Sequence, residues 1–114
     1  RNSLLIYQTK FLVVNAKHSL QSKYLNFPNE YKETYKNYIE KTNQKEHSLG
    51  QFKNLIENFE IGLLERYKIS LHPFIFDNKP IYIITDGVHR ASLCIFDSIN
   101  SLSEKYYKID NQNI

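Results

Sequence analysis

Apolar residues recur along this chain in patterns that predict short strands near its start and a helix after them. Two apolar runs of strand length cover residues 4–7 and 11–14. Residues 15–29 are polar and predict a loop. An apolar stripe at helical spacing then predicts an amphipathic helix over residues 30–41, formed by Tyr31, Tyr35, Tyr38 and Ile39. Such a stripe is typical of a helix face packed on a core, and a stacking surface for a ligand is the alternative.

A second helix is the most clearly marked element, and it follows a polar connector over residues 42–47. Ser48 and Gln51 have the spacing of a capping box, in which the serine hydroxyl accepts a hydrogen bond from the backbone N–H three residues later and the glutamine reaches back. A continuous apolar stripe follows, made of Phe52, Leu55, Ile56, Phe59 and Leu63. The pattern predicts one helix from Ser48 to near Tyr67, weakened in its last turn by Gly62.

Two further apolar stretches predict a hairpin of strands over residues 69–76 and 80–85. Asp77, Asn78 and Lys79 form a natural tight connection between them. The second stretch is apolar nearly throughout, which is typical of a central strand covered on both faces. Pro73 and Pro80 are expected near strand starts, where a missing backbone N–H is tolerated.

The last part of the chain predicts a helix over residues 91–99, a polar stretch over 100–105 and a short strand over 106–109. The whole string of elements predicts an α+β domain with a small mixed β-sheet flanked by helices. A length of 114 residues suits a single domain covering 1–114, with residues 1–47 less clearly assigned. Because the chain does not begin with Met, we expect it to be a fragment of a longer protein with a possible additional domain.

Composition and charge narrow the class of protein. The chain is 41% hydrophobic and 24% charged, which is typical of a globular protein rather than a disordered one. Its apolar runs are too short to span a membrane, so we expect no membrane partner and a cytoplasmic location. The net charge of +3 comes without a dense Lys/Arg cluster, so a nucleic-acid partner is not indicated. Cys94 is the single cysteine, which excludes an intrachain disulfide, and we expect it to be buried and inert.

The segment Asp86-Gly87-Val88-His89-Arg90 lies between the last apolar strand and the helix that follows it. A strand that breaks at a glycine and runs into a helix leaves free backbone N–H groups, and the helix dipole adds partial positive charge there. Such a helix start suits a phosphate. Gly87 permits a positive φ, and Arg90 can contact a phosphate with two nitrogens. His89 can donate to a phosphate oxygen or move a proton near neutral pH.

The neighbours of these residues have more than one possible role. Asp86 could cap the helix, orient His89 or Arg90, or hold a metal-bound nucleotide, and Ser92 could add a hydroxyl from the first helical turn. The alternative is purely structural, because Asp-Gly is a common turn. In that case Asp86 caps the helix and Arg90 pairs with Asp86 or with Asp97.

The stretch from Ile83 to Leu93 resembles the signature turn of the ParB/sulfiredoxin-like fold, in which a strand ends in a G-x-H-R or G-x-R-R turn and a helix follows. The preceding order of a capped helix, a proline-containing strand and a short turn also fits, so the resemblance covers roughly residues 48–109. It implies recognition of the phosphates of ATP, ADP or CTP, with Gly87, His89 and Arg90 in contact and Asp86 in support.

Two departures from that family limit what the resemblance implies. Val88 stands where sulfiredoxins have a reactive cysteine, so sulfinic acid reduction is not expected. No helix-turn-helix region follows the motif, so a nucleotide-gated DNA clamp is not expected either.

The leading functional expectation is therefore a nucleotide-phosphate-binding domain, and within it a small-molecule kinase or phosphotransferase that uses ATP or ADP with Mg²⁺. Asp86 and His89 would be its catalytic residues, and the phosphate contacts would come from Gly87, Val88, His89, Arg90 and Ser92. His47 and Ser48, at the start of the long helix, are expected beside the site. Glu46, Glu60 and Glu65 are weaker candidates for a base. The four histidines have no carboxylate at metal-ligand spacing, so no protein metal site is expected.

Two alternatives from other classes remain. One is a non-catalytic ligand-binding or regulatory module within a larger protein. The other is a nucleic-acid-binding, nuclease-like domain.

Overall fold

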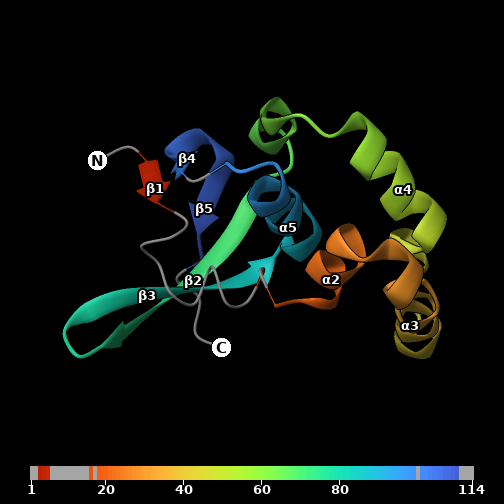
Figure 1. Cartoon of the computed structure of the whole chain (residues 1–114). Coiled ribbons are helices and arrows are strands. Elements are labelled where there is room, and N and C mark those ends of the chain that lie inside the picture. Colours follow the sequence, from red (N-terminus) through yellow and green to blue (C-terminus); the bar gives the residue numbers. More distant parts are fainter. Residues whose placement is uncertain (1–2, 6–15, 17, 100, 111–114) are drawn as a thin grey trace.

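Helix α5 (Val88–Phe96) lies between a small β-sheet and a group of three helices (Figure 1). The computed structural model describes residues 3–5, 16, 18–99 and 101–110. Within them, α5 contacts strand β2 on one side and helix α2 on the other. The predicted α+β class with a small mixed sheet is confirmed for these residues.

The sheet has the order β3–β2–β5 and is mixed, because β2 pairs antiparallel with β3 and parallel with β5. A separate antiparallel pair joins β1 to β4. The bounds of the strands are β1 Ser3–Leu5, β2 Ile69–Phe76, β3 Lys79–Asp86, β4 Ser101–Ser103 and β5 Tyr107–Ile109. The second predicted N-terminal strand, over residues 11–14, lies outside the described residues.

The predicted hairpin of β2 and β3 is confirmed, and it turns through Asp77 and Asn78 with φ of 51° and 62°. Two left-handed residues give the twist that two-residue hairpin loops need. Among the described strands, β2 has a neighbour on each side, because it lies between β3 and β5. Pro73 also lies within β2 rather than at its start. Its missing N–H is tolerated because β5 pairs with β2 over Ile69–Leu71, before the proline.

The loop predicted over residues 15–29 was wrong, because helix α2 (Leu20–Asn26) forms there. Ser19 caps it, its hydroxyl accepting from the backbone N–H of Ser22 at 3.1 Å. The apolar pattern was hidden because α2 buries two polar residues, Gln21 and Ser22, beside Tyr24 and Leu25.

Helix α3 (Pro28–Thr42) confirms the predicted helix over residues 30–41 and begins with a proline, which is well tolerated in a first turn. Tyr35 and Ile39 are buried in the core, in agreement with the packing interpretation. Tyr38, however, is 42% exposed.

Helix α4 (Leu49–Asn58) begins at the predicted cap, where the Ser48 hydroxyl accepts from the N–H of Gln51 at 3.3 Å. The prediction that it continues to Tyr67 was wrong. The backbone is extended at Phe59 and resumes as a short 3-10 helix, η2 (Ile61–Glu65). The break changes the helical register, so that Leu64 is fully buried in place of the expected Leu63.

Two corrections concern the last part of the chain. The polar stretch predicted over residues 100–105 contains β4 and a short 3-10 helix, η3 (Glu104–Tyr106), because one buried apolar residue, Leu102, is enough to anchor β4. Helix α5 begins at Val88, earlier than predicted, with Ala91 and Cys94 on its buried face. Residues of α5 belong to both hydrophobic clusters, one against the sheet and one against α2–α4, and this fixes where its first turn lies.

Candidate functional site

Gly87 forms the turn between β3 and α5, where the backbone conformation favours glycine and the packing leaves little space for a side chain. Its φ is 103°, in the left-handed region that side chains disfavour. A Cβ atom there would lie 3.1 Å from Nη2 of Arg90 and 3.4 Å from the Cα of Ile69. Among the described residues no side chain caps α5, so the alternative in which Asp86 caps this helix is not what the structure shows. The first backbone N–H groups of an α-helix have no partner within the helix, an arrangement that suits an anion.

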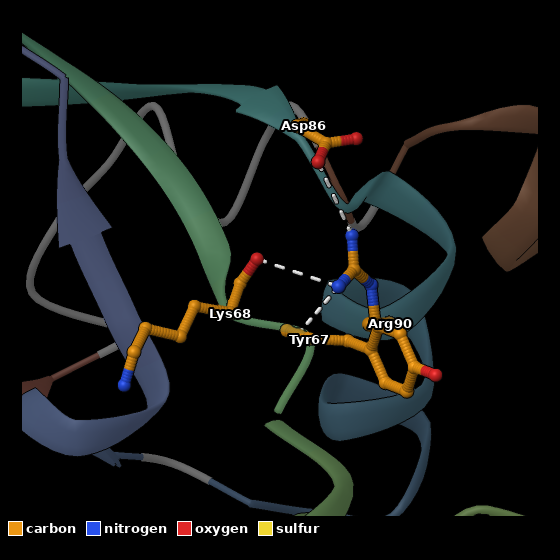
Figure 2. Close-up of polar contacts among 4 residues, drawn as sticks. All are labelled: Tyr67, Lys68, Asp86 and Arg90. Atoms are coloured by element: carbon orange, nitrogen blue, oxygen red, sulfur yellow. Dashed lines mark hydrogen bonds and ion pairs between the residues drawn. The ribbon is translucent and has the colours of Figure 1, made fainter. Parts of the chain in front are cut away.

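Arg90 is held by the protein itself (Figure 2). Its Nη1 donates to the carbonyl oxygen of Tyr67 and, at 3.3 Å, to that of Lys68. Its Nη2 contacts the Oδ2 atom of Asp86 at 3.5 Å, and the arginine side chain is 18% exposed. The structural alternative in which Arg90 pairs with Asp86 is thus what the structure shows. The guanidinium ties the segment before β2 to the first turn of α5.

His89 is the buried polar residue of the motif, with 9% of its surface exposed. Its ring stacks on that of His47, with 4.4 Å between centroids, and meets Phe52 edge-on at 4.8 Å. Its Nε2 atom lies 2.8 Å from the hydroxyl of Tyr35. Burial, the nearby His47 and then Arg90 lower the pKa of His89 from 6.5 to about 4. His89 is therefore neutral at physiological pH.

Tyr35 supports His89 from helix α3. Its hydroxyl donates to the backbone carbonyl of His47 at 2.6 Å, so this one phenol links both histidines. Tyr35 is fully buried, and burial raises the pKa of its hydroxyl above the ordinary value. It stays a neutral phenol across the physiological range.

A cleft of about 800 Å³ opens in front of these residues, where the ends of β3 and η2 meet the helices. Of the described residues that line it, four are Lys or Arg and one is a carboxylate. The basic residues are Arg66, Lys68, Arg90 and Lys108, and the acid is Asp86. The amino group of Lys68 is bound to the carbonyl of Lys105, and Figure 2 shows this side chain pointing away from Arg90. Arg66 and Lys108 are exposed. The cleft favours an anion.

The predicted site residues divide into two groups. Asp86, Gly87, Val88, His89, Arg90 and His47 all line the cleft. Ser92 is not among the described lining residues, because it is fully buried and its hydroxyl contacts Ser19 at 3.1 Å and the carbonyl of Ala16 at 3.3 Å. Ser48 serves as the cap of α4. Of the weaker acidic candidates, Glu65 pairs with Lys105.

Sequence reasoning missed several residues that line the cleft or support its lining. Tyr35 was assigned to the core, and no local signal connects it to a histidine 54 positions away. Tyr38 and Tyr67 also line the cleft with exposed side chains, 42% and 55%. For Tyr38, its place at the edge of the apolar stripe was the available signal. Arg66 and Lys108 come from segments that meet only in the folded chain.

The part of the chain that the structure describes contains no group of three or more His, Cys, Asp or Glu side chains arranged to hold a metal ion. Across the same residues, no helix combines the length and the apolar character needed to cross a membrane.

Comparisons with protein families, with curated proteins and with solved structures found no match to this chain.

Proposed function

We propose that this domain binds a nucleotide in the cleft, with the phosphates at the start of α5. The observation that carries the proposal is the meeting of the start of α5, which has no side-chain cap among the described residues, with a cleft whose described lining holds one acid and four basic residues, two of them exposed. The N–H groups of a helix start and its dipole attract anions, and basic side chains around the same space add to that attraction.

The exposed tyrosines of the cleft support a nucleotide over a simple phosphate. Tyr38 and Tyr67 present aromatic surface to the same space as the basic residues. A base can stack on a tyrosine ring, which contributes about 1–3 kcal/mol in nucleic-acid complexes. A volume of about 800 Å³ is within the usual range for a small-molecule site.

The geometry favours binding over phosphoryl transfer. Neither of the two residues that we expected to be catalytic is well suited to act as a base. Asp86 faces the guanidinium of Arg90 at 3.5 Å, and the lowered pKa of His89 makes it a weak base at neutral pH. We therefore propose a nucleotide-binding module rather than a kinase, which keeps the phosphate-binding expectation and sets aside the catalytic one.

Thermal-shift and calorimetric titrations with ATP, ADP and CTP, each with and without Mg²⁺, test the proposal. Binding raises the melting temperature in a concentration-dependent way. We expect a nucleotide to bind more tightly than inorganic pyrophosphate, because the tyrosines contact the nucleoside part. If none of these nucleotides changes the melting temperature at millimolar concentration, the proposal fails.

The variants must spare Arg90, because its loss would disturb the turn itself. The double variant Arg66→Ala/Lys108→Ala removes two exposed cleft charges, and we expect an affinity loss of about tenfold or more. The matched control is Lys32→Ala/Lys41→Ala, which removes two exposed charges from α3 outside the lining. Equal losses in both variants would mean that the effect is one of net charge alone.

A further inference from the structure

The hydrogen bonds around Tyr35 determine where the proton of His89 lies. A tyrosine hydroxyl has one proton to donate, and that of Tyr35 goes to the carbonyl oxygen of His47 at 2.6 Å. The 2.8 Å contact between the Tyr35 oxygen and Nε2 of His89 then requires the proton on the nitrogen. Nε2 is the donor in this contact.

The other ring nitrogen, Nδ1, is consequently a lone-pair acceptor. Nδ1 makes no hydrogen bond within the described residues. Every fully buried side-chain nitrogen or oxygen atom among these residues has a hydrogen-bond partner. Nδ1 must therefore reach the surface, and His89 lines the cleft. His89, with 9% of its surface exposed, thus keeps an unused acceptor that is not fully buried, and the same residue lines the proposed ligand space.

We infer that Tyr35 is a positioning residue that fixes His89 with its proton on Nε2, so that the cleft selects a ligand presenting a hydrogen-bond donor to Nδ1. The inference rests on the proposed function for its ligand, a nucleotide, whose hydroxyl or amino groups are the donors. Deprotonated phosphate oxygens have no proton to give and are repelled by the lone pair. The phosphates then lie at the start of α5 and beside Arg66 and Lys108, and Nδ1 of His89 accepts a hydrogen bond from another part of the nucleotide.

The tautomer is measured directly by ¹⁵N NMR of the imidazole rings in the free chain of 114 residues. Long-range ¹H–¹⁵N correlations distinguish a protonated from an unprotonated ring nitrogen, and the His89 signals are assigned by their absence in His89→Gln. We expect neutral His89 at pH 7 with the proton on Nε2. A proton on Nδ1, or an imidazolium, would overturn the inference without any ligand being added.

Replacing the hydroxyl tests the role of Tyr35. In Tyr35→Phe we expect His89 to become a mixture of both tautomers, because no acceptor holds the Nε2 proton. The control is Tyr24→Phe, since Tyr24 packs in the same cluster at 5.7 Å between ring centroids from Tyr35 and has no contact with His89 among the described interactions. An unchanged tautomer in Tyr35→Phe would contradict the positioning role. Should that variant not fold, the wild-type tautomer decides the question.

Addition of ATP or ADP separates this inference from the proposed function. We expect the unprotonated Nδ1 signal to move toward a hydrogen-bonded shift while His89 stays neutral. Conversion of His89 to an imidazolium on binding would mean that it donates to phosphate, and the inference would fail while nucleotide binding stood. If no signal of the cleft changes, the proposed function fails and so does the selection of a nucleotide, whereas the tautomer data still decide the role of Tyr35.

Discussion

The burial of neutral His89 makes the stability of this domain depend on pH in a way that can be calculated. The pKa of His89 is lowered from 6.5 to about 4 in the folded chain. Between these values the unfolded chain binds a proton that the folded chain does not, so stability falls as the pH falls. The contribution is complete above pH 6.5 and is lost progressively between pH 6.5 and pH 4.

The free energy of unfolding falls by about 1.4 kcal/mol for each pH unit below 6.5. At pH 5 the unfolded chain is largely protonated at this residue and the folded chain largely neutral. His89 alone should therefore lower the free energy of unfolding by about 2 kcal/mol between pH 8 and pH 5. Below pH 4 the total loss in the free energy of unfolding due to His89 levels off at about 3 kcal/mol, which is a large part of the stability of a small domain.

Urea unfolding at a series of pH values measures this effect, followed by circular dichroism because the chain has no Trp. The comparison is between the wild type and His89→Gln, which removes the titrating group but leaves the other histidines and the carboxylates. We expect the variant to be less stable at pH 8 but to lose about 2 kcal/mol less on going to pH 5. If both proteins lose the same stability over this interval, the reasoning on His89 is refuted.

Three further predictions concern the site and its surroundings. Gly87→Ala should lower the free energy of unfolding by about 1–3 kcal/mol because of the positive φ and the 3.1 Å approach to Arg90; Gly50→Ala, with nothing within 4 Å, should be neutral or stabilising in the same urea titration. Arg90→Lys should cost about 1–3 kcal/mol in urea unfolding, since a lysine cannot replace the contacts to the Tyr67 and Lys68 carbonyls, and an unchanged midpoint would contradict the role of Arg90. Cys94, whose pKa is raised to about 12 by burial and by Asp97, should resist a thiol reagent at pH 8 until urea is added, and fast labelling of the folded protein would exclude the buried position.

The sequence predicted those local elements whose residue pattern is compatible with only one local structure. The cap at Ser48, the stripe of α3 and the turn at Asp77 and Asn78 are of this kind, since each rests on contacts between residues close in the chain. The glycine turn before α5 belongs with them. Helix α2 was missed because Gln21 and Ser22 are buried polar residues, which reverses the usual pattern.

The site itself was predicted in part. The segment from Asp86 to Arg90 lines the cleft, yet the partners that define its chemistry come from distant positions. Tyr35 binds His89 across 54 positions, and the carbonyls of Tyr67 and Lys68 take up Nη1 of Arg90. These contacts depend on how α3 and η2 pack around α5, and residue spacing carries no record of that packing. Because of the contacts to the carbonyls of Tyr67 and Lys68, Arg90 stabilises the turn instead of being a free ligand for phosphate.

An ADP titration followed by the backbone ¹H–¹⁵N signals tests the central claim most directly, because it reports both whether a nucleotide binds and where. We predict that the amides of Gly87, Val88 and His89 shift first and most, together with those of Arg66 and Lys108. Phe27, an aromatic residue that is 55% exposed and does not line the cleft, provides the reference signal that should stay still. The account would be contradicted if ADP shifted other amides but not those at the start of α5, or if millimolar ADP shifted no amide signal.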